Sequence, residues 1–241
     1  MHKIVHADVF EALQLIEESP SLVYIDPPFG TGRDFIIDGI GYSDKWEDID
    51  VYMAFMRKVI EGIHDVLDDN GSILLHCDYR ASHRIAIALD EVFGTGDREK
   101  KHSAGFRNEF IWSYGLGGSS KRSYPKKHDS ILWYTKSKDW YFDPPMIPGK
   151  AKVCPIKKQP DVLDYTMGNM NKERVGYPTQ KPTKLLDMFV SAHTRPGELV
   201  ADFFCGSGTT GVSAKRLGRM SWQSDANEDA VRIARKRLDK A

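Results

Sequence analysis

The sequence contains few cysteines and no long hydrophobic run. Its three cysteines, Cys77, Cys154 and Cys205, are odd in number and far apart, which excludes a disulfide framework and a CxxC zinc site. No apolar run approaches the roughly 18 residues that a membrane span needs, and the N-terminus has no signal-peptide pattern. The eight histidines show no paired metal-ligand spacing. We therefore expect a cytoplasmic protein with no catalytic metal and no membrane partner.

Internal repeats and low-complexity tracts are also missing, which excludes a solenoid or a multi-domain array. The 241 residues are 41% hydrophobic and 28% charged, as is typical of a globular chain that buries a sizeable core. The net charge is zero, but residues 1–70 hold 5 basic and 15 acidic residues and the remainder holds 29 and 19. A basic remainder suits a polyanionic partner, and packing of the two parts against each other explains the asymmetry equally well.

Short apolar runs alternate with segments of helical periodicity along most of the chain. The predicted strands are residues 3–6, 22–25, 72–77, 199–204 and 220–224. The predicted helices are residues 9–18, 51–67, 80–93, 183–193, 210–217 and 229–238. Residues 110–114 and 130–135 predict an antiparallel hairpin with a long connecting loop. This alternation indicates an α/β fold with a mostly parallel sheet covered on both faces.

Residues 139–178 differ from the rest of the chain. They contain six prolines and show little periodicity, which predicts an inserted segment rather than core. We therefore divide the chain into residues 1–138, an inserted segment at 139–178, and residues 179–241.

A glycine-rich loop follows the strand predicted at 199–204. Gly206 and Gly208 make a tight turn before the next helix, where backbone N–H groups face a ligand. Asp225 follows Gly206 by 19 positions, a spacing at which a carboxylate can accept hydrogen bonds from ribose hydroxyls. The loop has neither a full GxGxxG pattern nor the lysine of a P-loop. It therefore favours a ribose-bearing ligand other than a dinucleotide or ATP.

A second motif, Asp26-Pro27-Pro28-Phe29, ends the strand predicted at 22–25. The two prolines stop the strand and leave carbonyl groups beside the Asp26 carboxylate and the flat ring of Phe29. Ligands of open α/β sheets bind outside the carboxyl ends of the strands, so this tetrad and the glycine loop can share one crevice although about 180 positions separate them. Acceptors beside an aromatic ring suit a planar molecule with an exocyclic amine. A second Asp-Pro-Pro, at 143–145, follows no buried strand, and we interpret it as structural.

Together these motifs resemble the beta class of DNA amino-methyltransferases over nearly the whole chain. The residues that carry the resemblance are the tetrad at 26–29, Gln180-Lys181-Pro182, Leu185-Leu186 and the Phe204-Cys205-Gly206-Ser207-Gly208 loop. Tyr42, Asp44 and Trp46 resemble a further stretch of that family. The resemblance implies a circularly permuted Rossmann-like methyltransferase fold, with a mostly parallel seven-stranded sheet and an antiparallel hairpin. In that fold, residues 1–138 are the catalytic part, 139–178 the target-recognition segment and 179–241 the cofactor-binding part.

The permuted order assigns each predicted strand a place. Residues 3–8, 22–26 and 72–78 would be the third, fourth and fifth strands of the family sheet, and the hairpin the sixth and seventh. Residues 199–204 and 220–225, late in the chain, would be the first and second strands.

The resemblance implies S-adenosylmethionine as the cofactor. Asp225 would bind its ribose hydroxyls, and Asp8 and Val9 its adenine edge. The methionine moiety would meet Thr179, Lys181 and Pro182. The other predicted cofactor-binding residues are Asp26, Asp202, Phe204, Cys205, Gly206, Ser207, Gly208 and Thr209. Phe203 stands where the family commonly has proline.

The same resemblance makes Asp26, Pro27, Pro28 and Phe29 the catalytic residues. An exocyclic amine is a poor nucleophile because its lone pair is delocalised into the base. Hydrogen bonds from the amine to the Asp26 carboxylate and the Pro27 carbonyl would localise that lone pair for in-line attack on the methyl group. Phe29 would stack on the extruded base. No covalent intermediate is needed, so we interpret Cys205 as a small loop residue.

Basic residues in two irregular regions, with one tyrosine among them, are the predicted DNA contacts. They are Lys121, Arg122, Tyr124, Lys126, Lys127, Lys150, Lys157 and Lys158, with Arg33 in a flexible segment that can close over an extruded base. Solvated lysines on mobile loops are the alternative interpretation. His76 and Asp78 end a strand near the crevice, and we interpret His76 as a buried, hydrogen-bonded histidine rather than a catalytic one.

The sequence thus predicts a site-specific DNA methyltransferase acting on the N6 amine of a flipped adenine, because aspartate begins the tetrad as in the adenine-N6 members. The alternatives are methylation of cytosine N4 or of an RNA base on the same fold, and a catalytically silent subunit that binds S-adenosylmethionine or DNA. An oxidoreductase is disfavoured by the incomplete GxGxxG pattern. Double-stranded DNA is the predicted partner, and a second copy of the chain and a cognate restriction endonuclease are further candidates.

Overall fold

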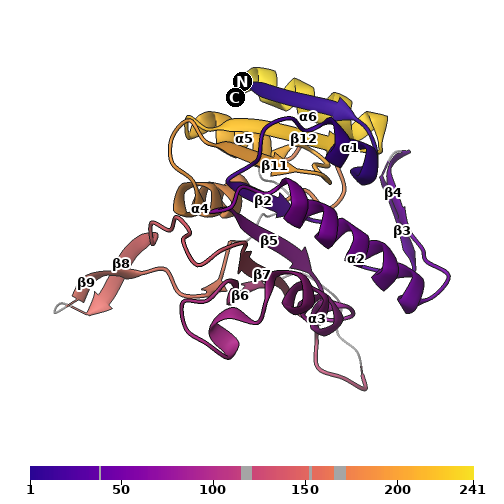
Figure 1. Cartoon of the computed structure of the whole chain (residues 1–241). Coiled ribbons are helices and arrows are strands. Elements are labelled where there is room, and N and C mark those ends of the chain that lie inside the picture. Colours follow the sequence, from indigo (N-terminus) through magenta and orange to yellow (C-terminus); the bar gives the residue numbers. More distant parts are fainter. Residues whose placement is uncertain (38, 115–120, 152–153, 166–171) are drawn as a thin grey trace.

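A twisted eight-stranded sheet runs through the centre of the molecule (Figure 1). The structure is a computed structural model that describes residues 1–37, 39–114, 121–151, 154–165 and 172–241. In spatial order the strands are β1 (His2–His6), β12 (Met220–Asp225), β11 (Leu199–Asp202), β2 (Leu22–Ile25), β5 (Ser72–Cys77), β7 (His128–Thr135), β6 (Gly105–Ser113) and β10 (Val162–Leu163). Strand β7 is antiparallel to both of its neighbours, and the other pairs are parallel.

The strand order confirms the circular permutation. Strands β11 and β12, from the end of the chain, lie between β1 and β2, from its beginning. Helix α6 (Glu228–Lys240), at the end of the chain, accordingly packs against β1, at its beginning (Figure 1). All seven predicted strands are present. The eighth, β10, is only two residues long and too short for periodicity to reveal, and it pairs with Ile111 and Trp112 of β6.

Helices cover both faces of the sheet. Helices α1 (Val9–Leu15), α2 (Ile49–Val66) and α3 (Ser82–Phe93) lie on one face, and α4 (Thr183–His193) and α5 (Thr209–Arg216) lie with α6 on the other. Side chains of β2 alternate between the two layers, with Val23 and Ile25 facing α2 and Leu22 and Tyr24 facing α4. In the described ranges, no helix is long and apolar enough to cross a membrane.

In α2, the hydrophobic residues that predicted a helix are the ones that the fold buries. The buried residues of α2 recur at helical spacing: Tyr52, Met56, Val59, Ile60 and Ile63. The helix begins where the Asp48 carboxylate accepts hydrogen bonds from two backbone N–H groups of the first turn, at 2.8 and 2.9 Å.

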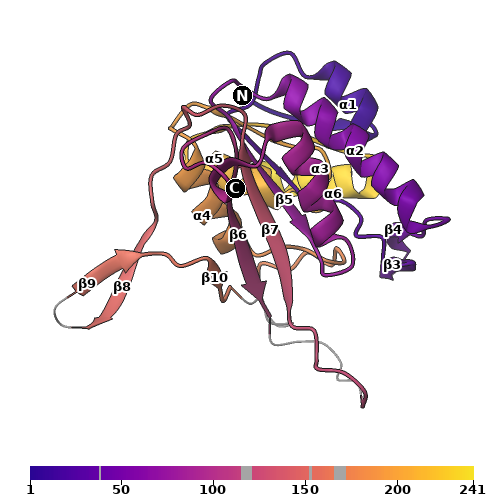
Figure 2. The same cartoon turned by 60° about the horizontal axis from the view of Figure 1, so that its bottom comes forward.

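Two hairpins outside the main sheet were not predicted. Strands β3 (Arg33–Ile37) and β4 (Ile40–Asp44) form an antiparallel pair shortly after the tetrad, in a stretch for which no strand was predicted. Strands β8 (Met146–Ala151) and β9 (Cys154–Lys158) form a second pair within the inserted segment, and Figure 2 shows this hairpin projecting away from the body. Neither hairpin has the buried, alternating pattern that marks a core strand. Ile36 on β3 is 59% exposed and Ile156 on β9 is 58% exposed.

Candidate active site

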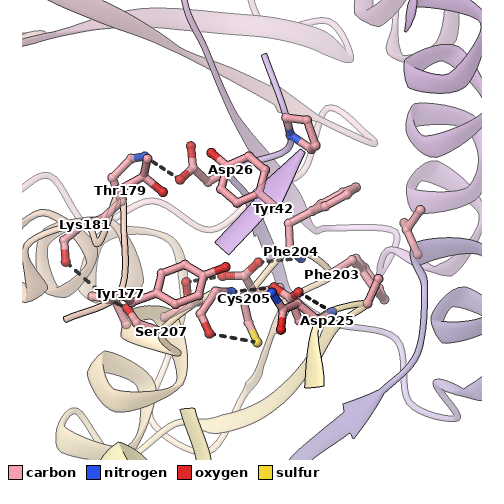
Figure 3. A pocket seen from close by; sticks show the side chains of 18 of the residues that line it. Asp26, Tyr42, Tyr177, Thr179, Lys181, Phe203, Phe204, Cys205, Ser207 and Asp225 are labelled. Carbon is pink, nitrogen blue, oxygen red and sulfur yellow. Dashed lines mark hydrogen bonds and ion pairs between the residues drawn. The ribbon is translucent and has the colours of Figure 1, made fainter. Parts of the chain in front are cut away.

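The fold places a crevice between the carboxyl ends of β11 and β2. These strands are neighbours in the sheet, but the helix that follows β11 lies on one face and the helices that follow β2 lie on the other. Such a switch point is where open α/β sheets bind ligands. A cavity of about 650 Å³ opens there, within the range of small-molecule sites (Figure 3).

The cavity brings together residues from both ends of the chain. The predicted site residues that line it are Asp8, Val9, Asp26, Pro28, Thr179, Lys181, Asp202, Phe204, Cys205, Gly206, Ser207, Thr209 and Asp225. Pro27, Phe29, Pro182 and Gly208 are not among its lining residues. The tetrad and the glycine loop therefore share one cavity. Aromatic lining residues without a sequence signal were missed: Phe10, Phe55 and Tyr177.

Asp225 fixes the glycine loop directly. Its Oδ2 accepts a hydrogen bond from the Gly206 N–H at 2.8 Å, and its Oδ1 accepts one from the Asn227 N–H at 2.9 Å. Burial raises the pKa of the Asp225 carboxyl. Gly208 has a φ of +77°, and a Cβ there would lie 2.6 Å from the Cβ of Ala234 on α6, so both conformation and space require glycine.

Asp202 lies beneath the same loop. Its carboxylate accepts hydrogen bonds from the Thr210 hydroxyl at 2.5 Å and from the Phe204 N–H at 3.0 Å. Burial raises its pKa to about 7, although both hydrogen bonds oppose the rise. Phe203, which replaces the usual proline, packs on Trp222 with ring centroids 5.6 Å apart and adds to the core.

The two oxygens of Asp26 have different surroundings. Oδ2 forms an ion pair with the ammonium of Lys181. Oδ1 is buried, has no hydrogen-bond partner in the part of the chain that the structure describes, and lies 3.6 Å from Nδ1 of His76. The Lys181 ammonium also lies 5.7 Å from the ring centroid of Phe29 and 5.8 Å from that of Trp112. Lys181, predicted to meet the cofactor, is therefore also in contact with the tetrad.

Asp44 holds the segment that follows the tetrad. Its buried carboxylate accepts backbone hydrogen bonds from Phe29, Gly30 and Thr31 at 3.2, 2.9 and 2.9 Å. It also accepts hydrogen bonds from the Thr31 hydroxyl at 2.7 Å and from the Trp46 indole at 3.1 Å. A buried carboxylate with five donors thus holds residues 29–31, and Arg33 begins β3, while the closure of this segment over an extruded base stays a prediction.

The β3–β4 hairpin forms one wall of the cavity. Gly41, Tyr42 and Ser43 line it, and the Gly41 carbonyl accepts a hydrogen bond of 2.5 Å from the side-chain amide of Asn227. Burial raises the pKa of the Tyr42 phenol. Ile40 packs against a small apolar cluster that includes Tyr177. Residues after β2 thus contact residues after β12 across the cavity.

The thiol of Cys205 is unsuited to nucleophilic attack. The side chain is buried, and burial raises its pKa well above the usual value, so the thiol keeps its proton. This agrees with its interpretation as a small loop residue.

Two segments project from the body: the loop between β6 and β7, and the β8–β9 hairpin. The predicted DNA contacts other than Arg33, which is on β3, belong to these two projections. Lys121, Arg122 and Lys126 are exposed and Lys127 is partly exposed in the loop between β6 and β7, and Tyr124 there is 94% exposed. Lys157 and Lys158 are exposed on β9. Lys150 belongs to β8, with its side chain outside the described part. Figure 2 shows the loop and the hairpin both extending away from the body.

Comparison with known proteins places the chain in a family. It matches the family model N6_N4_Mtase, described as DNA methylase, over residues 21–236. The chain belongs to this DNA methylase family. The match confirms the resemblance to DNA amino-methyltransferases that the tetrad and the glycine loop indicated.

Curated relatives match this methylase over almost its full length. It is 28% identical to the type II methyltransferase M.HpaI of Haemophilus parainfluenzae, over 98% of this chain and 74% of that protein. It is 27% identical to the DNA adenine methyltransferase YhdJ of Escherichia coli strain K12, over 99% of this chain and 83% of that protein.

Solved structures confirm the fold. The S-adenosylmethionine complex of M1.HpyAVI has a TM-score of 0.71 and 24% identity, covering 99% of this chain and all of that one. The cytosine-N4-specific PvuII DNA methyltransferase has a TM-score of 0.74 and 21% identity, covering 98% of this chain and 85% of that one.

Proposed function

We propose that this methylase transfers a methyl group from S-adenosylmethionine to the exocyclic N6 amine of an adenine in double-stranded DNA. One observation carries the proposal. The Asp26 carboxylate, at the end of β2, lines the same cavity as the glycine loop and Asp225. A hydrogen-bond acceptor for an amine and a cradle for a ribose-bearing ligand are thereby adjacent.

The lining of the cavity fits this cofactor. At one end, aromatic rings lie beside polar groups of two chain segments, as a nucleoside requires: Phe10, Trp46, Phe55 and Phe204 with Asp8, Asp225 and Asn227. The other end is lined by Gln180, Lys181, Ser207 and Thr209, which suit an amino acid moiety. When bound, S-adenosylmethionine supplies a methyl group on a positively charged sulfur.

Each predicted residue then has a role in holding the cofactor. Asp225 would accept hydrogen bonds from the ribose hydroxyls, and Asp8 and Val9 would meet the adenine edge. The methionine end would lie against Thr179, Lys181 and the segment that includes Pro182. The other groups that would surround it are Asp26, Asp202, Phe204, Cys205, Gly206, Ser207, Gly208 and Thr209.

The tetrad would activate the acceptor. The Asp26 carboxylate and the Pro27 carbonyl would accept the two hydrogens of the amine, which concentrates electron density on its nitrogen. Pro28 follows the Pro27 carbonyl and restricts the backbone there, and the Phe29 ring would stack on the extruded base. The amine then attacks in line without a covalent intermediate with the protein.

Two features favour adenine. Aspartate begins the tetrad, as in the adenine-N6 members that the sequence resembles, and the relative YhdJ is named as an adenine enzyme. The likeness to the cytosine-N4-specific PvuII enzyme makes cytosine N4 the second candidate, with the same tetrad chemistry.

The exposed basic groups of the two projections, with Arg33 on β3, would contact DNA phosphates. Because the inserted segment is short, a second copy of the chain would extend the contact with the duplex.

Sedimentation of the protein with a duplex tests whether two copies bind, and a DNA-bound monomer would overturn this proposal. A cognate restriction endonuclease remains a candidate partner in the cell.

The deciding experiment follows labelled methyl from S-adenosylmethionine into unmethylated genomic DNA, with digestion to nucleosides and mass spectrometry. We expect N6-methyladenine with the wild type and none with Asp26→Ala, while Asp26→Ala still binds the cofactor in calorimetry. Detection of N4-methylcytosine instead would leave the proposed mechanism unchanged and assign cytosine as the target base. Cofactor binding without any methylated deoxynucleoside would contradict the proposal and favour an RNA substrate or a silent subunit.

A further inference from the structure

His76 lies fully buried behind the tetrad, between two carboxylates from distant parts of the chain. Its Nδ1 is 3.6 Å from Oδ1 of Asp26, and its Nε2 is 3.1 Å from Oδ2 of Asp129 on β7. The hydroxyl of Tyr24 lies 3.0 Å from Nδ1. The expected buried, hydrogen-bonded histidine is therefore confirmed, but one of its neighbours is the proposed catalytic carboxylate.

The surroundings define which imidazole nitrogen carries the proton. Burial, reinforced by nearby carboxylates, raises the pKa of Tyr24 far above its usual value, so its hydroxyl keeps its proton and donates to Nδ1. Burial favours the neutral acid at Asp129, but the hydrogen bonds to His76 and Tyr114 and the charge of Lys181 oppose it, and the pKa of Asp129 is lowered. Asp129 is therefore a carboxylate that accepts from Nε2–H, and in that tautomer the lone pair of Nδ1 faces Tyr24 and Asp26.

The proposed reaction leaves a proton to be removed. Once its nitrogen is bonded to the methyl group, the amine carries one proton too many. In the proposed arrangement the acceptor is the Asp26 carboxylate, whose Oδ1 has no hydrogen-bond partner among the described residues, whereas Oδ2 is engaged by Lys181. A proton retained on Asp26 would leave the site without its carboxylate for the next turnover.

We propose that His76 is a positioning residue that receives this proton from Asp26 and so restores its carboxylate, with Asp129 stabilising the resulting imidazolium. The inference rests on the proposed function. The N–H bond of the methylated amine breaks as an O–H bond forms on the Asp26 carboxylate. Rotation of the carboxyl group about its Cβ–Cγ bond brings this O–H to the side of His76, where it breaks as an N–H bond forms at Nδ1, and the Tyr24 hydroxyl turns to act as acceptor. The imidazolium then lies between two carboxylates, as its charge requires.

The groups around His76 define what a pH profile can report. Tyr24 and Asp26 approach it from β2 and the residues that follow, and Asp129 approaches from β7. The rings of Phe29 and Trp112 close the remaining sides, with centroids 5.5 and 5.4 Å away. Beyond these, Lys181 pairs with Asp26, and the Tyr114 hydroxyl donates to Asp129 at 3.0 Å.

The test compares single-turnover methyl transfer in wild type and His76→Gln across about pH 5 to 8, the range in which histidine titrates. Glutamine can still donate to Asp129 but cannot take a proton. We expect a loss of about 10²- to 10⁴-fold, as for general acid–base groups, and disappearance of the acid limb of the profile. Cofactor affinity by calorimetry should stay within about threefold of wild type, because His76 is not among the residues lining the cavity. His193→Gln, at a second buried histidine among Trp133 and Phe142, is the matched control and should keep the acid limb.

A second variant covers the case in which His76→Gln fails to fold. Asp129→Asn can still accept from Nε2–H but removes the charge that stabilises the imidazolium, so the acid limb should move to lower pH. NMR of the cofactor-free protein provides a readout independent of activity. One imidazole signal should be lost in His76→Gln, and its titration should move to lower pH in Asp129→Asn.

The outcomes separate this inference from the proposed function. Wild-type rates within threefold and an unchanged acid limb in both variants would overturn the role of His76 while methyl transfer stands. A wild-type protein that binds the cofactor but methylates no deoxynucleoside would contradict the proposed function itself, and the inference with it.

Discussion

The ammonium of Lys181 forms an ion pair with the Asp26 carboxylate, joining residues 155 positions apart in sequence. The side chains of Lys181 and Asp26 are only 10% and 18% exposed, so water screens the pair weakly. The glycine-loop end of the chain thus supplies the counter-charge for the tetrad at the other end. The permuted fold brings the two together because β2 and β11 are adjacent in the sheet.

Replacing Lys181 with methionine keeps the aliphatic stem and removes this charge. We expect the single-turnover rate to fall about 10- to 100-fold, because a preorganised charge next to the reacting group is lost. The cofactor dissociation constant, measured by calorimetry, should also rise, because the proposed function places the methionine end of the cofactor against Lys181, and Lys181→Arg should recover much of the rate. A loss of cofactor affinity with the single-turnover rate retained at saturating cofactor would contradict the role of this charge at Asp26.

Asp44 provides a test of how the tetrad is held in place. Asparagine at this position keeps one acceptor oxygen, but its amide NH₂ faces N–H groups that donate hydrogen bonds to the Asp44 carboxylate. Those donors lose their acceptor, and each unpaired buried group costs about 1–3 kcal/mol of stability. Thr31→Val removes one of the five donors, the hydroxyl, and is the matched control. In thermal unfolding we expect Asp44→Asn to lower the midpoint by more than about 5 °C and Thr31→Val by about 2–4 °C. Equal shifts would contradict a central role for the carboxylate.

The elements that were predicted correctly share a simple physical basis. The strands of the main sheet and the helices against it bury continuous or periodic apolar residues, as in Leu22–Ile25, where all four side chains are buried. The tetrad and the glycine loop were found because prolines and glycines impose backbone geometry locally. Asp225 was found because a fixed spacing places it at the end of the next strand.

The features that were missed depend on contacts between distant segments. Nothing near Asp26 in sequence indicates Lys181 or Asp129 as a neighbour of the tetrad, because these contacts arise from sheet order alone. The β3–β4 hairpin exposes Ile36 and Ile37, so its apolar pattern does not read as a strand. Its contacts with Asn227 and Tyr177 form only when the two ends of the chain come together in the folded sheet.

Asp202 should make stability fall as the pH rises. Its pKa is about 7 in the folded protein against 3.8 as a free side chain, so the folded state binds the extra proton between about pH 4 and 7. Stability contributed by the neutral acid is complete at low pH and is lost as the pH rises toward 7. Asparagine at position 202 cannot ionise. In urea unfolding, we therefore expect the free energy of unfolding of Asp202→Asn, relative to that of wild type, to be a few kcal/mol more favourable at pH 8 than at pH 5. A relative stability that is the same at both pH values would show that Asp202 is ionised throughout.

The β8–β9 hairpin should contribute to DNA affinity through charge. Lys157 and Lys158 are exposed on β9, and the hairpin projects from the body (Figure 2). Each lysine that neutralises a phosphate releases a counterion and adds about 0.9 to the slope of log affinity against log salt. For the double variant Lys157→Ala and Lys158→Ala, we expect weaker duplex binding in fluorescence anisotropy and a slope reduced by about 2. The matched control changes two exposed lysines of α6, Lys236→Ala and Lys240→Ala, at the opposite edge of the sheet, and should leave the slope unchanged. If both pairs reduce the slope equally, the contribution is that of net charge alone, and the hairpin lysines are solvated groups rather than phosphate contacts.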